Sequence, residues 1–271
     1  MLWRTVFGIA NNMTEDRSES GNVKSVFRAV KILELLAEKN SLGITEISRF
    51  LGLPKSSVYE ILSTLLAENI LEKDHDRNTY NLGLKLFELG ITAQKNLEIK
   101  RIATPHIRKL NELLDETVHL TVLEDDEVLY IDCFESTKRL RTYSVIGVKA
   151  PLHCTAVGKA MLAYLSSDEV DRIIKEKGLE RFTSQTLSDP EALKKDLETI
   201  RSRGYSFDNM EHEEWVRCVA APVRNHEGRV FASISVSGPV QRMPAERDRE
   251  VIRLLLEETR EISRKLGFRE S

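Results

Sequence analysis

The stretch from Ile44 to Leu66 constrains the fold more than any other part of the chain. Its apolar residues recur at helical spacing twice, once before Gly52 and again after Pro54. Glycine permits the positive φ that a sharp turn at a helix end often needs, and proline suits the start of a helix. The pattern therefore predicts two short helices joined by a tight turn, a helix-turn-helix, with Thr45 as the N-cap of the first helix.

The second of these helices presents a small, polar and partly cationic face in its first turns. Those turns meet base edges and phosphates when such a helix lies in the major groove of DNA. Short strand candidates at Ile70–Lys73 and Thr79–Leu82 surround a polar turn and indicate a winged version of the motif. The candidate DNA-contacting residues are Ser25, Arg28, Lys55, Ser56, Ser57, Tyr59, Lys73 and Arg77.

A further amphipathic helix precedes the motif. Its apolar stripe, which we expect to be buried, consists of Val26, Ala29, Val30, Leu33, Leu36 and Ala37. Residues 23–81 contain eight Lys or Arg and eight Asp or Glu, so this region is electrostatically neutral. DNA binding would therefore depend on a few placed cations rather than on bulk attraction. A winged helix that binds protein instead of DNA is the alternative.

The whole chain has the composition of a soluble globular protein. Its 271 residues suggest two domains, and its net charge of −3 gives no general attraction to polyanions or membranes. Cys133, Cys154 and Cys218 are too few and too scattered for a disulfide framework, which suits a reducing cytoplasm. No apolar run approaches the roughly 20 residues of a membrane-spanning helix.

The pattern divides the chain into four segments. We expect a disordered leader over residues 1–22, the winged helix-turn-helix domain over 23–82, a linker helix over 83–98 and a second domain over 99–271. In the second domain, helices alternate irregularly with strand candidates, among them Leu140–Val145. This mixed order predicts an α+β fold built on a mainly antiparallel sheet.

Three segments of the second domain are candidates for a binding site: Pro151–Ala160, Asp208–His212 followed by Arg217–Val223, and Ala232–Pro239. Small residues in Pro151–Ala160 lead directly into a helix, where exposed backbone N–H groups would suit a carboxylate or a phosphate. Close helix–sheet packing explains the same residues equally well. Ser233, Ser235 and Ser237 share one face of a strand, which indicates the floor of a polar pocket or, alternatively, a solvent-exposed face.

The chain from about Val23 to Gly267 resembles the IclR family of bacterial transcriptional regulators. The resemblance rests on motifs that occur in the family's order: Ser25–Ala29, Leu53–Tyr59, Tyr80–Gly83, His153–Ala160, Arg217–Val223 and Ser233–Pro239. It implies an N-terminal winged helix-turn-helix, a linker helix and a C-terminal effector-binding domain related to the GAF fold.

The resemblance also implies a function. Such proteins bind operator DNA as dimers or dimers of dimers and respond to small molecules, often carboxylic acids of carbon catabolism. We accordingly expect a bacterial cytoplasmic regulator, a repressor, that binds a small organic acid and needs no cofactor. The residues expected to bind the effector are His153, Ala156, Val157, Gly158, Asp208, Cys218, Ser235 and Ser237.

Two alternatives concern the same residues. His153, Cys154, Asp208 and Cys218 are the types that a Cys–His hydrolase would use, but Cys218 lies within a predicted strand rather than at an activating helix end, so we expect no catalysis. His153, Asp208 and Cys218 are also residue types that zinc accepts. They lack a tight metal-ligand spacing, which leaves only opportunistic zinc binding.

Overall fold

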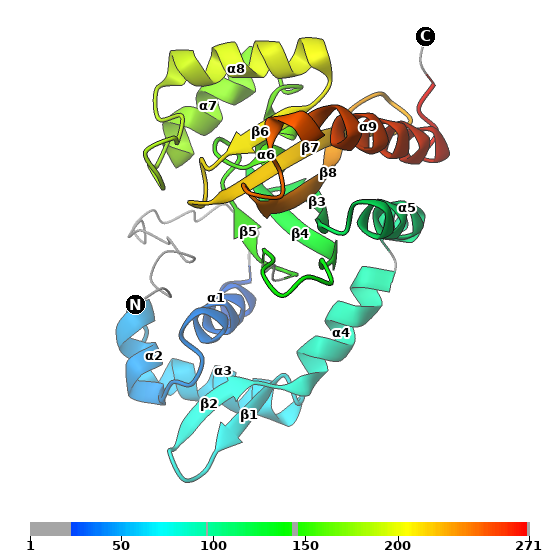
Figure 1. Ribbon diagram of the computed structural model, residues 1–271. Coiled ribbons are helices and arrows are strands. Elements are labelled where there is room, and N and C mark those ends of the chain that lie inside the picture. Colours follow the sequence, from blue (N-terminus) through cyan, green and yellow to red (C-terminus); the bar gives the residue numbers. More distant parts are fainter. Residues whose placement is uncertain (1–22, 96, 143–145, 270–271) are drawn as a thin grey trace. The chain divides into compact units, whose positions relative to one another are not determined.

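The computed structural model describes residues 23–95, 97–142 and 146–269. The chain divides into two compact units, Met1–Ala93 and Gln94–Ser271, which are described separately (Figure 1). Residues 1–22, for which a disordered leader was predicted, lie outside the described part of the chain.

The first unit contains the predicted helix-turn-helix. Its elements are α1 (Lys24–Lys39), α2 (Ile44–Leu51), α3 (Lys55–Ala67), β1 (Leu71–Asp74), β2 (Thr79–Leu82) and α4 (Leu84–Lys95), and β1 pairs with β2 as an antiparallel hairpin. Gly52 closes α2 in the left-handed conformation at φ 62°, as its position predicts. The prediction for Thr45 was wrong: Gly43 is the N-cap, and the Glu46 carboxylate accepts its N–H at 2.9 Å.

The core of the first unit lies between α1, the two motif helices and the hairpin. Its buried members are Ile32, Leu36, Leu42, Ile47, Val58, Leu62, Leu71 and Tyr80. The stripe predicted for α1 is only partly buried, because Val26 and Val30 are 60% and 45% exposed. Ile32 and Leu36, on the C-terminal half of α1, are the residues that anchor this helix.

The second unit is an α+β domain with helices on both faces of a sheet. Its strands are β3 (Thr117–Glu124), β4 (Glu127–Phe134), β5 (Lys149–Ala150), β6 (Ser206–Asn209), β7 (Val216–Arg224) and β8 (Val230–Pro239). They pair antiparallel in the order β5-β4-β3-β8-β7-β6. The helices are α5 (Glu98–Leu114), α6 (Ala156–Leu162), α7 (Ser167–Lys177), α8 (Pro190–Arg203), the short η1 (Ala245–Arg247) and α9 (Asp248–Lys265).

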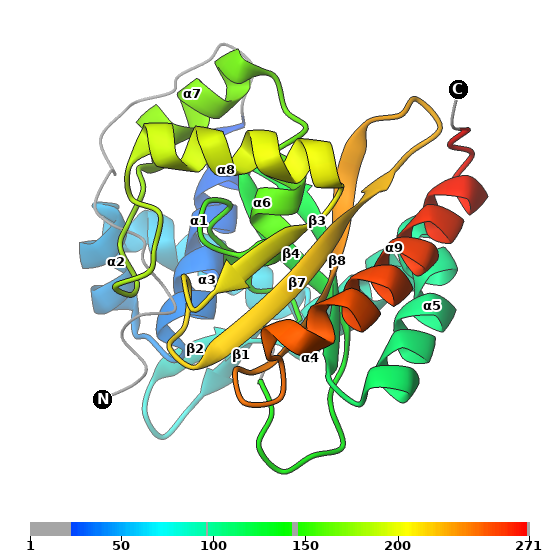
Figure 2. The ribbon, with the colours of Figure 1, turned by 45° about the horizontal axis from the view of Figure 1, so that its top comes forward.

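Each face of the sheet has its own apolar core. Figure 2 shows α5 and α9 on one side of the sheet and α6, α7 and α8 on the other. Alternate residues of the strands serve the two faces, so Ile234 and Val236 pack toward α5 and α9 whereas Ala220 packs toward α6. The strand predicted at Leu140–Val145 is not present over residues 140–142, and 143–145 lie outside the described residues. The edge position beside β4 is occupied by β5 instead.

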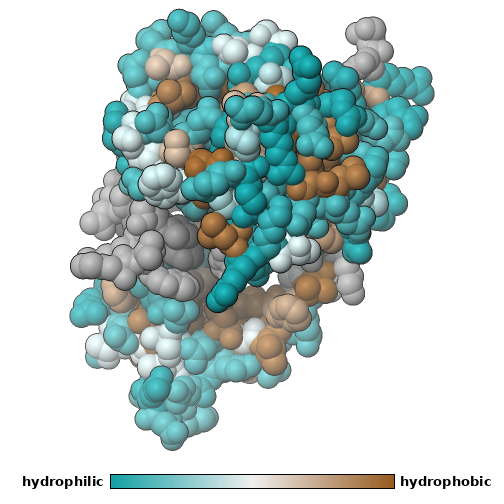
Figure 3. All heavy atoms as spheres, in the orientation of Figure 1, coloured by the Kyte–Doolittle hydropathy of each residue, from teal (hydrophilic) through white to brown (hydrophobic). Residues whose placement is uncertain are grey.

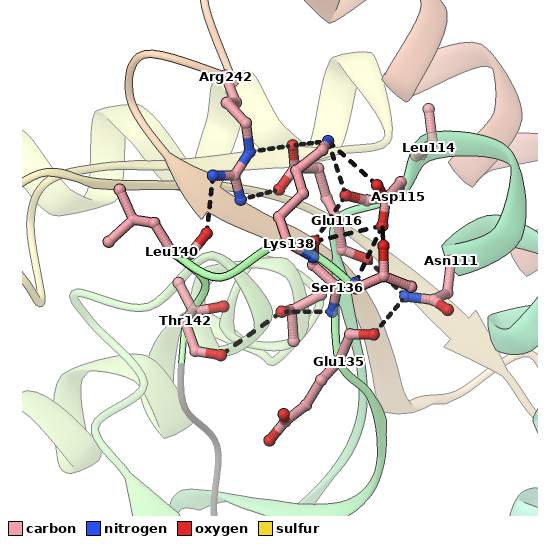
Figure 4. Close-up of polar contacts among 12 residues, drawn as sticks. Asn111, Leu114, Asp115, Glu116, Glu135, Ser136, Lys138, Leu140, Thr142 and Arg242 are labelled. Atoms are coloured by element: carbon pink, nitrogen blue, oxygen red, sulfur yellow. Dashed lines mark hydrogen bonds and ion pairs between the residues drawn. The ribbon is translucent and has the colours of Figure 1, made fainter.

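A buried carboxylate secures one end of this sheet. Glu116, immediately before β3, has no exposed surface, and Arg242 donates to both of its oxygens at 2.8 and 2.7 Å (Figure 4). The charged groups of Lys138 and Arg247 lie 3.3 and 3.2 Å from Oε1 of the same carboxylate. Burial alone would raise the pKa of Glu116, but the hydrogen bonds from Arg242 and Lys138 hold it below its usual value. The cluster thereby ties the start of β3 to the segments that follow β4 and β8.

Replacing Glu116 with alanine should destabilise the second unit by about 3 kcal/mol, because three cations would lose their common partner. Since the folded-state pKa of Glu116 is depressed, its contribution is fully present above the ordinary value of 4.5 and is lost as the pH falls through the lower folded-state pKa. Urea denaturation at neutral and acidic pH measures both effects. Equal stability of the alanine variant and the wild type at neutral pH would contradict this role.

On the face shown in Figure 3, hydrophilic side chains cover most of the area, and apolar ones form small separate patches. Among the described residues, no helix combines the length and the apolar character needed to cross a lipid bilayer.

Candidate functional sites

The first turns of α3 line a hollow on the surface of the first unit. This hollow, of about 540 Å³, is bordered by Lys55, Ser56 and Tyr59 together with the start of α2 and Asn78 of the hairpin turn. Tyr59 is 59% exposed although it is aromatic. The structure therefore brings three of the predicted DNA-contacting residues together on one surface. Asn78 was missed by the sequence analysis, and only its place in a polar turn could have indicated it.

The other predicted residues of this unit lie outside the hollow. Ser57 is half-buried on α3, while Ser25 and Arg28 lie in the first turns of α1. The Lys73 ammonium packs over the Tyr80 ring, 5.6 Å from its centroid. Arg77, in the turn between β1 and β2, has a side chain that is 79% exposed.

Large apolar side chains are exposed on several elements of the first unit, and on α1 and α4 they occur in groups. Val26 and Phe27 in the first turns of α1 are 60% and 55% exposed. Leu84, Phe87 and Leu89 of α4 are 73%, 67% and 51% exposed. Groups of exposed apolar residues commonly mark surfaces that bind another protein chain.

In the second unit, strand register places the predicted polar residues in two adjacent rows. One row crosses four strands through Asp208, Cys218, Ser237 and Thr117, and the next crosses Ser206, Ala220, Ser235 and His119. Residues that lie opposite one another in antiparallel strands project from the same face. Because Ala220 and Cys218 pack in the core beneath α6, both rows face that helix.

The serine face is internal, which rules out the solvent-exposed alternative. Ser233, Ser235 and Ser237 are each at most 4% exposed. The hydroxyls of Ser235 and Ser237 lie 3.2 and 3.4 Å from Nδ1 of His119. Burial lowers the pKa of His119 to about 4, so its imidazole is neutral at pH 7.

His119 was missed by the sequence analysis. It alternates along β3 with Thr117 and Thr121, and this polar period within an otherwise apolar strand is the signal that could have identified it. Its relation to the serines could not be predicted, because β3 and β8 are separated by more than one hundred residues.

The sequence predicts exposed backbone N–H groups at the start of α6, but hydrogen bonds within the protein already use at least one of them. The Thr155 hydroxyl caps α6 by accepting the N–H of Gly158 at 3.1 Å, so that this donor is already engaged. A Cβ on Gly158 would lie 2.5 Å from backbone atoms of Leu152. Close packing therefore explains Gly158, while Ala156 and Val157 are buried beside it in the first turn.

Asp208 is the buried carboxyl of the two polar rows. It is 4% exposed, and its Oδ1 accepts the backbone N–H of Glu211 at 2.7 Å. Burial raises the pKa of Asp208 to about 7, against the opposing effect of the Glu211 hydrogen bond. Near neutral pH this carboxyl can therefore either donate or accept a hydrogen bond.

The contacts of His153 and the burial of the cysteines bear on the hydrolase and zinc alternatives. Nε2 of His153 lies 2.9 Å from the carbonyl oxygen of Glu180, and its ring packs against Phe182. Burial raises the pKa of both Cys154 and Cys218, which keeps them as thiols rather than reactive thiolates. Within the described residues, no group of three or more His, Cys, Asp or Glu is placed to hold a metal ion.

A larger groove of about 840 Å³ lies elsewhere in the second unit, along α9. It contains none of the residues predicted to bind an effector. Its walls carry Arg224, Arg253, Arg260, Arg264 and Arg269 together with Glu257 and Glu261. Ion pairs such as Arg264–Glu261 occur along the helix itself, as on a solvated helix face.

Comparisons with known proteins match two family models to the chain, one to each of the two units. The family model of the IclR helix-turn-helix domain matches residues 25–75, and the model described as bacterial transcriptional regulator IclR C-terminal matches residues 91–264. A helix-turn-helix followed by such a domain defines the class of DNA-binding transcriptional regulators.

Individual relatives are similar over nearly the whole chain. The HTH-type transcriptional regulator KdgR of Escherichia coli is 39% identical over 91% of this chain and 94% of its own length. The transcriptional repressor IclR of the same organism is 35% identical over 92% of each chain. The chain therefore belongs to the IclR family, whose members found here are transcriptional regulators rather than enzymes.

One similar solved structure contains a bound small molecule. It is an IclR homologue from Microbacterium hydrocarbonoxydans in complex with 4-hydroxybenzoate. It is 26% identical to this chain, covers 89% of it and 98% of its own chain, and superposes with a TM-score of 0.78.

Proposed function

We propose that this regulator is a bacterial cytoplasmic repressor whose affinity for operator DNA is controlled by a small organic acid. The observation that carries the proposal is that one chain contains both an exposed, partly cationic helix start on α3 and two buried polar rows beneath α6. The first suits the surface of DNA, and the second suits a small polar ligand. The repressor role is supported by the relative IclR, which is named as a repressor.

Operator binding is assigned to a homodimer. The exposed apolar residues of α1 and α4, among them Phe27, Leu84 and Phe87, provide a surface that a second copy could cover. Two copies would place two α3 helices in successive major grooves of a near-palindromic operator. Dimers could pair further into tetramers.

The effector is assigned to the rows that contain Asp208, Cys218, Ser235 and Ser237, close to Ala156 and Val157. A small acid with a hydroxyl or oxo group suits these residues, because serine hydroxyls and a carboxyl near its pKa can donate or accept hydrogen bonds. The bound 4-hydroxybenzoate of the relative supports an organic acid of this size. A coupling of about 1–3 kcal/mol between the two sites would be typical of such regulators.

A ligand screen tests the proposal. Thermal unfolding is measured with 4-hydroxybenzoate and a panel of small oxo and hydroxy acids, and each stabilising acid is then added to an operator-binding assay. We expect at least one acid to raise the unfolding temperature and to change operator affinity. Operator binding that no stabilising acid alters would contradict control by an organic acid.

Replacing Ser235 with leucine should remove the effector response while operator binding persists. The larger leucine side chain would occupy the position of the Ser235 hydroxyl, which lies 3.2 Å from Nδ1 of His119, and would crowd the row that is assigned to the effector. Ser235→Ala is the matched control, since it removes the hydroxyl without adding volume and should weaken the response only partly. The measurement is operator affinity with and without an acid identified in the screen. An unchanged response in Ser235→Leu would show that the effector binds elsewhere.

A further inference from the structure

Lys159 is a charged residue buried within α6. Its side chain is 2% exposed, and its ammonium lies 2.8 Å from Oδ2 of Asp196 and 2.7 and 2.9 Å from the two oxygens of Glu211. An ammonium has three N–H donors, so these contacts saturate it. Lys159 therefore has no donor left for a ligand, although it directly follows Gly158.

Glu211 connects this ammonium to the candidate effector pocket. Its carboxylate contacts Lys159, and its backbone N–H donates to Oδ1 of Asp208 at 2.7 Å. Its carbonyl oxygen accepts hydrogen bonds from the hydroxyls of Thr183 and Thr186 at 3.3 and 2.6 Å. One residue thus joins α6, the end of β6 and the segment before α8.

We propose that Lys159 is a positioning residue for the effector pocket, which it serves by holding Glu211 so that the Glu211 N–H fixes the Asp208 carboxyl. The inference depends on the proposed effector site only where it predicts an effect on ligand binding. The geometric chain from Lys159 through Glu211 to Asp208 stands without a ligand.

If Lys159, Asp196 and Glu211 only stabilised the fold, the variants would behave differently. Breaking a buried ion pair by removing one partner is strongly destabilising, whereas replacing both partners with apolar residues of similar size is often neutral. If stability were the whole role, a variant with apolar residues at positions 159 and 211 would regain it, since the third member of the cluster, Asp196, is 26% exposed and can be solvated. A positioning role predicts that this variant regains stability but loses the anchor that the Glu211 side chain provides, so that only the backbone hydrogen bonds with Asp208, Thr183 and Thr186 hold residue 211.

The test compares Lys159→Met with the double variant Lys159→Met/Glu211→Met. Glu211→Gln is the conservative variant, because its amide can still accept from Lys159. Lys194→Met is the matched surface control, since Lys194 pairs with Asp171 and Glu191 in exposed ion pairs. Unfolding is measured for every variant.

Hydrogen exchange of the peptide covering residues 209–213 is the decisive measurement and needs no ligand. We expect exchange about tenfold faster than wild type in both Lys159 variants. We expect wild-type exchange in Glu211→Gln and Lys194→Met. A peptide from β7 reports whether the sheet is intact. If Lys159→Met does not fold, the double variant decides.

Binding of 4-hydroxybenzoate is measured calorimetrically as a second, functional result. Slow exchange at 209–213 in a folded Lys159 variant would overturn the positioning role, whatever binds. Absence of 4-hydroxybenzoate binding to the wild type bears only on the proposed effector class. If the wild type binds this acid, affinity at least about tenfold lower in the double variant supports the inference, and unchanged affinity overturns it.

Discussion

Replacing Lys55 with glutamate is expected to weaken operator binding by about 100-fold or more, because each subunit of the proposed dimer would exchange a cation assigned to a phosphate contact for a repelling anion. Lys55 is the first residue of α3, is exposed and forms no ion pair with any described residue. An acidic residue at a helix start is favourable to the helix dipole, so the variant should be at least as stable as the wild type. Gel-shift titrations at several salt concentrations measure the loss.

Salt dependence separates this mechanism from a general loss of structure. A dimer that loses one phosphate contact per subunit should show a slope of log affinity against log salt that is smaller by about 2. Lys39→Glu is the charge control, since it makes the same charge change in the same unit at a residue outside the hollow. Its unfolding is measured as well, because Lys39 lies in the last turn of α1 and pairs with Glu38. Wild-type operator affinity in Lys55→Glu would refute the assignment of α3 to the DNA surface.

Replacing Gly158 with alanine should destabilise the second unit by about 3 kcal/mol or more. The added Cβ would lie 2.5 Å from both Cα and O of Leu152 and 2.6 Å from the Thr155 hydroxyl. Because the Leu152 contacts are backbone atoms, no side-chain rotation can relieve them. Urea denaturation followed by circular dichroism measures the difference.

The control for Gly158→Ala is a glycine-to-alanine substitution that should raise the free energy of unfolding. Gly90 lies within α4, and a Cβ there would meet nothing within 4 Å. Gly90→Ala should therefore stabilise the first unit by about 0.5–1 kcal/mol through helix propensity. Wild-type stability of Gly158→Ala would mean that the Pro151–Thr155 segment can move away from α6, contrary to the packing described.

The helix-turn-helix was predictable because its determinants are local. The helical spacing around Gly52 and the polar start at Lys55 depend on residues within a few turns of each other. The stripe of α1 was only partly predictable, since periodicity identifies an apolar face but not whether this chain alone covers it. Val26 and Val30 belong to that stripe and are largely exposed.

For the candidate effector site, the sequence predicts which strand residues share a face. It does not predict the distant residues that contact them. The alternation of Ser235 and Ser237 indicates a shared face, which the structure confirms as internal. The contacts of these serines with His119, and of Lys159 with Glu211, join residues far apart in the sequence. Such contacts follow from strand register and helix packing, which a single sequence does not reveal.

The two-faced sheet also bears on how this protein can change over evolutionary time. Along β8, Ser235 and Ser237 face α6, whereas Ile234 and Val236 belong to the core beneath α5 and α9. If the proposed effector site is correct, substitutions at every second position would alter ligand preference while the residues between them continue to maintain the fold. One strand thus carries an adaptable and a constrained set of positions, interleaved, so that new specificities can arise without rebuilding the domain.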